Sequence, residues 1–124
     1  MNRGSNPERA LPLLEKALST ESFQSTAWEW AKGHSYVLLR RYEDMLVHIL
    51  PVVKANPKFV PARVQLARGY AEMGRMADAE ATVNTILEIA PKYRLASAAR
   101  MFPYPKLEDR ERLLGALRDA GLPD

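Results

Sequence analysis

Residues 60–93 read VPARVQLARGYAEMGRMADAEATVNTILEIAPKY, and residues 26–59 carry the same pattern less completely. The two stretches share both residue types and apolar character at positions 34 residues apart. The matched pairs include Tyr36 with Tyr70, Arg41 with Arg75, Asp44 with Asp78, Met45 with Ala79, Ile49 with Val83, and Pro57 with Pro91. A common offset over so many pairs indicates an internal repeat, which has to be recognised before any other feature of the fold.

Each copy has the pattern of two helices joined by a turn. Apolar residues recur at spacings of three and four, which predicts a buried stripe on each helix. Small residues such as Ala67 and Ala79 let the two helices approach closely. Gly74 suits the turn between them, and Pro57 and Pro91 end one unit and begin the next.

Extended along the chain, this pattern predicts seven helical segments. We place them at residues ~7–20, ~25–39, ~42–55, ~58–73, ~76–89, ~92–101 and ~106–119, with ends uncertain by a few residues. Pro12 and Pro51 fall inside helical patterns and are expected to kink or shorten those helices. Phe102-Pro103-Tyr104-Pro105 breaks the helical period before the last helix.

The 34-residue unit resembles the tetratricopeptide repeat, a helix–turn–helix motif. The match is clear at residues 60–93 and degenerate at 26–59, where Glu29, Lys32 and Arg40 depart from the family pattern. The resemblance implies an all-α fold, a right-handed superhelical stack of antiparallel helix pairs with a C-terminal capping helix. Residues 1–124 would form a single domain, divided into the second helix of a preceding unit at 7–24, the two repeats, and a capping tail at 94–124.

The tail carries a second resemblance. Residues 102–124, from Phe102-Pro-Tyr-Pro to Gly121-Leu-Pro-Asp124, are similar to the C-terminal end of repeat regions in bacterial class III adenylate/guanylate cyclase-type signalling proteins. The resemblance implies that a nucleotidyl cyclase domain lies upstream in the full-length protein.

Composition argues against several other functions. The chain has no cysteine, which excludes Cys-ligated metals and thiol nucleophiles. The net charge of the chain is +3, and the excess of basic residues is spread along residues 54–100 rather than clustered in a short block, so we expect no nucleic-acid partner. The first residues are polar and no apolar run reaches the ~18 residues of a membrane span, so we expect a cytoplasmic chain without a membrane partner.

Phosphate-binding glycine loops and metal-ligand spacings are missing, and His34 and His48 are interpreted as structural or solvated. We therefore predict a non-catalytic chain with no cofactor and no metal.

The expected function is a protein–protein interaction scaffold that binds an apolar peptide or helix in its concave groove. Repeat stacks present such a groove along the first helix of each unit. Positions carried over from the family place seven residues there: Trp30, His34, Val37, Leu38, Val64, Arg68 and Glu72.

Three alternatives remain open at this stage. Arg68 can contact a partner or form an i,i+4 ion pair with Glu72. The groove can be occupied by the chain's own C-terminal helix. The alternative function is homo-oligomerisation, in which a homodimer brings attached domains together.

Overall fold

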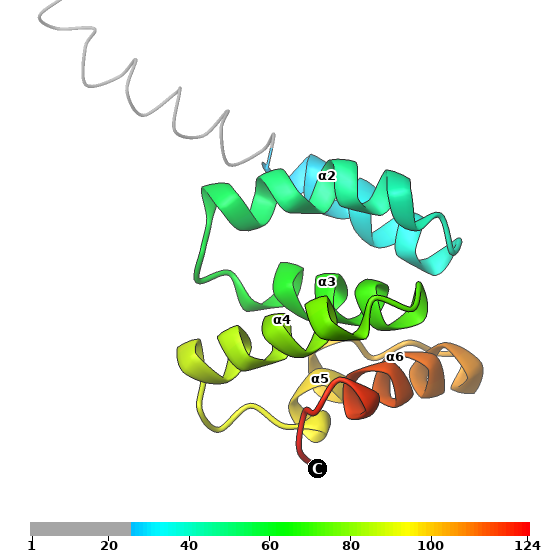
Figure 1. Ribbon diagram of the computed structural model, residues 1–124. Helices are drawn as coiled ribbons and strands as arrows, with labels where there is room; N and C mark the ends of the chain where they lie inside the picture. The colour runs from blue at the N-terminus through cyan, green and yellow to red at the C-terminus, as the bar shows by residue number, and fades with distance from the viewer. Residues whose placement is uncertain (1–25) are drawn as a thin grey trace, which may run out of the picture.

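The structure, a computed structural model, describes residues 26–124, and the helix expected at residues 7–24 lies outside the described residues. Every regular element in this part of the chain is an α-helix (Figure 1). A helix over residues 26–38 is followed by α2 (Tyr42–Ala55), α3 (Val60–Glu72), α4 (Met76–Ile89), α5 (Leu95–Met101) and α6 (Leu107–Asp119). The all-α prediction is confirmed. Pro51 does not shorten α2, which continues to Ala55.

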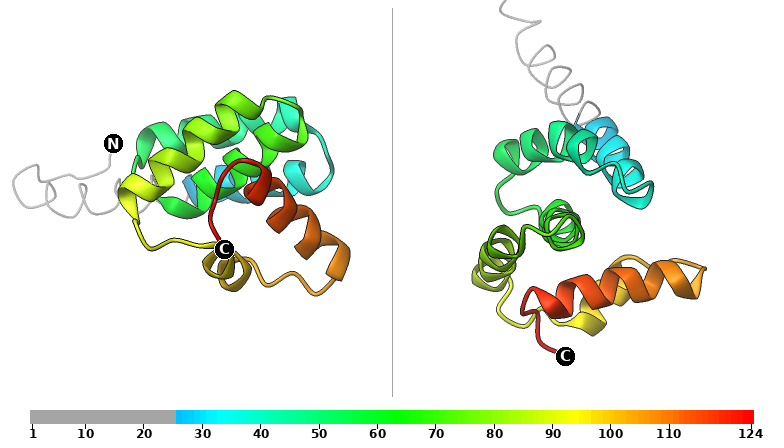
Figure 2. Two further views of the ribbon diagram at one scale, coloured as in Figure 1. Left: turned by 60° about the horizontal axis from the view of Figure 1, so that its bottom comes forward. Right: turned by 45° about the vertical axis from the view of Figure 1, so that its right-hand side comes forward.

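The helices stack as antiparallel pairs, with α3 in the middle. The 26–38 helix pairs with α2, and α3 pairs with α4 in the next layer (Figures 1 and 2). α3 also contacts α2 on one side and α6 on the other, and α6 contacts the short helix α5. The C-terminal helix therefore packs on the first helix of the clear repeat.

The two repeats make their turns in the same way. Arg40 and Gly74 occupy equivalent positions and both have positive φ angles, of 61° and 87°. In each turn the next residue donates a backbone hydrogen bond of 2.8 Å to the repeat tyrosine, Arg41 to Tyr36 and Arg75 to Tyr70. The degenerate copy thus keeps the turn although an arginine stands where glycine is the unstrained choice.

The repeated side chains explain why the sequence offset is preserved. The Arg41 guanidinium lies 5.1 Å from the Tyr36 ring centre, and that of Arg75 lies 4.8 Å from the Tyr70 ring centre. The same two arginines form ion pairs with the carboxylates three residues later, at 2.7 Å and 2.8 Å. Each turn is therefore fixed by one arginine that contacts both an aromatic ring and a carboxylate.

Two buried clusters form the core, one on each side of α3. One joins Val37, Met45 and Ile49 to Leu66, and the other joins Val64 to the α4, α5 and α6 residues. Close approach is enforced by glycine: a Cβ at Gly33 would collide with the side chain of Ile49, and one at Gly69 with that of Met45. The small residues predicted for close helix contact include Ala67 and Ala79, and both are fully buried.

The C-terminal segment closes the second cluster. Phe102, Leu113, Leu117 and Leu122 are all buried in it. The backbone N–H of Leu95 donates to the carbonyl of Pro123 at 2.9 Å, which ties the end of the described chain to the start of α5. Gly121 takes the positive φ of 101° that lets the chain turn back after α6.

The equivalent turn positions should respond oppositely to substitution. Gly74→Ala places a side chain at positive φ and is expected to lower the free energy of unfolding by about 1–2 kcal/mol. Arg40→Gly removes the same strain and is expected to leave that free energy unchanged or slightly higher. Urea unfolding of the two variants beside the wild type measures both effects. Equal losses at the two positions would contradict the shared turn geometry.

Candidate functional site

The residues predicted to line the groove lie along the facing sides of the 26–38 helix and α3. Val37, Val64 and Arg68 have an exposed fraction of 0%, whereas Trp30, His34, Leu38 and Glu72 are partly buried. Val37 belongs to one core cluster and Val64 to the other. The structure brings Trp30, His34, Arg68 and Glu72 into one continuous strip of aromatic and polar side chains, which we call the groove strip.

Aromatic rings form the first part of the groove strip. The Trp30 and His34 rings are stacked, with their centres 5.3 Å apart and an angle of 7° between their planes. Phe102, from the segment between α5 and α6, lies 5.2 Å from the His34 ring and 6.0 Å from the Trp30 ring. Phe59 meets the edge of Trp30 at 5.9 Å. A ring of the chain's own C-terminal segment therefore already covers this part of the strip.

A single hydroxyl group organises the middle of the strip. The phenol oxygen of Tyr104 lies 2.6 Å from His34 Nε2, and it accepts hydrogen bonds from Gln65 Nε2 at 2.9 Å and Arg68 Nη1 at 3.1 Å. Arg68 Nη1 also donates to Gln65 Oε1 at 3.1 Å. Because two neighbours donate to the oxygen, the phenol proton is directed to the unprotonated Nε2 of His34.

A carboxylate forms the last part. Glu72, at the end of α3, accepts from Arg68 Nε at 3.2 Å, Tyr42 Oη at 2.8 Å and Arg112 Nη2 at 2.7 Å. The ion pair of Arg68 with Glu72, one of the two readings of Arg68 from the sequence, is therefore present. Arg112, from α6, also donates to the carbonyls of Val37 and Leu38 at 3.2 Å and 3.3 Å. It thereby caps the C-terminal end of the 26–38 helix, where carbonyl groups lack partners within the helix.

Burial and neighbouring charge set the pKa values in the strip. Burial, aided by the positive charge of Arg68, lowers the pKa of His34 from 6.5 to about 4, so the ring is neutral at pH 7. Burial raises the pKa of Tyr104 above its ordinary value, against the opposing effects of Arg68 and Gln65. Burial also disfavours the charge of Arg112, but its hydrogen bond and attraction to Glu72 outweigh this and raise its pKa.

Six contributors to the strip were missed by sequence reasoning: Tyr42, Phe59, Gln65, Phe102, Tyr104 and Arg112. Gln65 lies one turn before Arg68 on the same helix, which is a usable signal. The aromatic residues at 102 and 104 interrupt the helical period, and such residues need a place to be buried. The 34-residue repeat pattern does not predict that these two residues are buried in the groove, because the pattern ends before residue 102.

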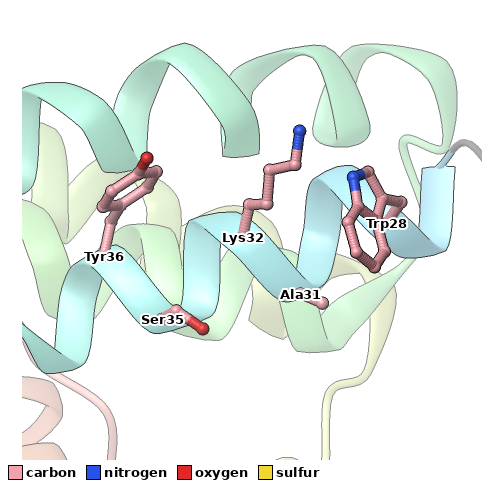
Figure 3. A pocket seen from close by; sticks show the side chains of 5 residues that line it. All are labelled: Trp28, Ala31, Lys32, Ser35 and Tyr36. Atoms are coloured by element: carbon pink, nitrogen blue, oxygen red, sulfur yellow. The ribbon is translucent and has the colours of Figure 1, made fainter.

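A second hollow lies on another side of the 26–38 helix. It is open, has a volume of about 370 Å³, and is lined by Trp28, Ala31, Lys32, Ser35 and Tyr36. Figure 3 shows Trp28, Lys32 and Tyr36 projecting from one side of this helix. The exposed fraction of Trp28 is 65%, and the Lys32 ammonium lies 5.6 Å from its ring centre. The two tryptophans therefore face different surroundings, Trp30 in the groove strip and Trp28 at this hollow.

The described residues offer little else for chemistry. They contain no group of three or more acidic or histidine side chains that could hold a metal ion. The acidic partner of His48 is Glu29, which lies at hydrogen-bond distance, and the His48 ring stacks on Tyr36 at 5.3 Å. The structural interpretation of both histidines agrees with these contacts. None of the described helices is both long and apolar enough to cross a membrane.

Comparison with known proteins identifies the class of the fold. Residues 46–100 match the family model of the tetratricopeptide repeat. Together with the all-helical stack, this match supports a tetratricopeptide-repeat protein. Repeats of this kind generally mediate protein–protein interaction and typically serve as non-catalytic scaffolds. Searches of curated proteins and of solved structures returned no match.

The hydroxyl of Tyr104 should contribute measurably to stability. Tyr104→Phe leaves the buried Gln65 amide without its acceptor and is expected to lower the free energy of unfolding by about 1–3 kcal/mol. Tyr93→Phe is the matched control, because the Tyr93 hydroxyl donates only to the sulfur of Met101, at 3.3 Å. That loss should stay below about 1 kcal/mol, since thioether sulfur is a weak acceptor. Chemical denaturation measures both, and equal losses would contradict the role of the Tyr104 network.

Protonation of His34 should weaken the fold in acid. Since its pKa is about 4 in the folded chain and near 6.5 when unfolded, its stabilising contribution is complete above pH 6.5. The contribution is lost as the pH falls toward 4, with a slope of at most about 1.4 kcal/mol per pH unit. Urea unfolding across this range measures the slope. His34→Gln keeps a polar side chain but removes the titration, so an identical profile in that variant would disprove the assignment.

Proposed function

We propose that this chain is a protein-interaction module whose concave groove binds an apolar peptide or a helix of a partner protein. The observation that supports the proposal is the groove strip itself. Trp30 and His34 offer stacked rings, and Arg68 and Glu72 offer charges at fixed positions beside them. Residues of the chain's own tail lie on all four, which supports the proposal that this face accommodates an aromatic segment followed by a helix.

The module is proposed to contribute binding rather than catalysis. Non-catalytic scaffolding is the typical use of tetratricopeptide repeats, and the polar members of the groove strip are already hydrogen-bonded, Arg68 to Glu72 and all three to residues of the tail. Buried polar networks of this kind fix geometry and give specificity to an interface.

The wider context of the module is also a proposal. The similarity of residues 102–124 to the ends of bacterial cyclase-type signalling proteins favours a nucleotidyl cyclase domain upstream and a role in signalling within the cytoplasm. In that setting the module would recruit or sense a protein for the attached domain.

Homo-oligomerisation is the second candidate, and the hollow at Trp28 favours it. Trp28 and Leu39 are each 65% exposed; residues 28, 32 and 36 follow one another at helical spacing along the 26–38 helix, and Leu39 lies in the turn directly after it. Large apolar side chains exposed along one stripe are typical of interaction surfaces. A second copy of the chain bound there would form a dimer without using the groove strip.

Two tryptophan variants separate these candidates. Trp30→Ala removes an aromatic anchor from the groove and is expected to reduce capture of the partner by about tenfold or more, because aromatic anchors dominate such interfaces. Trp28→Ala should leave capture unchanged. The measurement is quantitative pull-down by the full chain. Thermal unfolding of each variant shows how much of the effect comes from the loss of Trp30 packing in the fold.

The opposite pattern would overturn the groove assignment. Loss of capture with Trp28→Ala but not Trp30→Ala would place the partner at the hollow. Sedimentation velocity at micromolar concentration then tests the second candidate. A dimer that Trp28→Ala converts to a monomer supports homo-oligomerisation, and a monomeric wild type excludes it.

A further inference from the structure

The tail segment 102–112 makes three separate contacts with the groove strip, each with a different chemistry. Phe102 places a ring against Trp30 and His34. Tyr104 places a hydroxyl among His34, Gln65 and Arg68. Arg112, one helix further on, places a guanidinium against Glu72 and the end of the 26–38 helix. Pro103 and Pro105 flank the tyrosine and are exposed.

The middle contact is selective for a hydroxyl group. Gln65 and Arg68 donate to the oxygen, which any acceptor would satisfy. His34 is neutral, and its Nε2 needs a donor. A phenol supplies both functions from one atom, whereas a phenylalanine supplies neither. The site therefore discriminates tyrosine from phenylalanine.

The last contact is selective for arginine. Glu72 and two helix-end carbonyls surround the Arg112 guanidinium and accept from two of its nitrogens in different directions. A planar guanidinium meets such divergent acceptors, and an ammonium group does not match them equally well. The side chain of Glu72 is only 11% exposed, so an unpaired carboxylate there is costly.

The tail does not satisfy the strip completely. Within the described part of the chain, the buried nitrogens Arg68 Nη2 and Arg112 Nε have no hydrogen-bond partner. An unsatisfied buried donor is unfavourable. A partner that supplies one more acceptor beside Arg68 would therefore fit the same strip better than the tail does.

We propose that residues 102–112 are an intramolecular competitor in the groove, and that the protein partner presents the same three groups: an aromatic ring, a tyrosine in a proline-rich turn, and an arginine on the following helix. The inference rests on the proposed function, because it specifies what the groove recognises. The tail, being tethered, competes at a high effective concentration. A partner binds only the fraction of molecules whose tail is released, so weakening the tail raises the apparent affinity.

The experiment uses the full chain and a fluorescein-labelled peptide of residues 100–114 as the probe, with fluorescence anisotropy as the measurement. Arg112→Ala removes the guanidinium from the tail of the protein while the peptide keeps its own. We expect this variant to bind the peptide at least about tenfold more tightly than the wild type does. Arg110→Ala is the matched control, since Arg110 is exposed on the same helix and reaches only the Pro105 carbonyl, at 3.5 Å. It should bind as the wild type does.

A second peptide makes the test specific. A peptide with phenylalanine in place of Tyr104 should bind the Arg112→Ala protein about tenfold more weakly, because it leaves the Gln65 donor and the His34 acceptor unpaired. Equal affinity of wild type and Arg112→Ala for the probe, or of the two peptides for Arg112→Ala, overturns the inference. If Arg112→Ala is unfolded by circular dichroism, the Tyr104→Phe protein replaces it and the same outcomes apply.

The result is separable from that of the proposed function. If Trp30→Ala loses partner capture but releasing the tail does not tighten peptide binding, the groove binds its partner without competition from the tail and only this inference fails. If Trp30→Ala retains full capture, the proposed function fails whatever the peptides do.

Discussion

A fully buried positive charge organises this molecule. Arg68 lies on the central helix α3 with none of its surface exposed, and a buried cation is tolerated only where anions and acceptors surround it. Glu72 supplies the charge, and Gln65 and Tyr104 supply the oxygens. Tyr104 comes from the tail, so Arg68 keeps one of its acceptors only when the tail lies in the groove. Burial, together with this cation, lowers the pKa of His34 and keeps its ring neutral, and the ring accepts a hydrogen bond from the Tyr104 hydroxyl. Packing of the closing segment is thus coupled to the electrostatics of the groove.

The repeat explains how such a buried site is held in position. Each turn is fixed by an arginine that contacts its tyrosine ring and its carboxylate, and this arrangement is the same in both copies. The degenerate copy tolerates Arg40 at a positive φ because the surrounding contacts are unchanged. Glycines at 33 and 69 let α2 approach both first helices closely enough to bury Met45 and Ile49. The facing sides of those two helices are therefore rigid, and rigid elements position binding groups better than loops do.

The sequence predicted the parts of this fold that depend on periodicity. Helices 42–55 and 76–89 were predicted to the residue, and the turn at Gly74 followed from its residue type. The groove positions came from the family pattern, and four of them do meet in one strip. The sequence did not predict Tyr104 or Arg112, which lie 36 and 40 residues from their partners Arg68 and Glu72. After Phe102 the period stops, and the direction of α6 depends on how a proline-rich break turns in three dimensions. The conformational preferences of proline predict that the helix is interrupted here, but they do not predict the direction in which the chain continues.

The coupling between the Arg68 charge and the tail also restricts the chemistry of the partner that we propose for the groove. Removing the tail without replacement would leave the Glu72 carboxylate with one guanidinium instead of two. It would also expose Arg68 and His34 to water and remove the hydrogen bonds that both make to Tyr104. A peptide or helix that is apolar throughout would bury these groups unpaired, which is more costly than leaving the tail in place. Displacement of the tail is therefore favourable only for an apolar segment that also supplies the hydroxyl and the guanidinium. Under the proposed function, the buried polar groups of the strip, rather than its apolar area, would set the specificity of the groove.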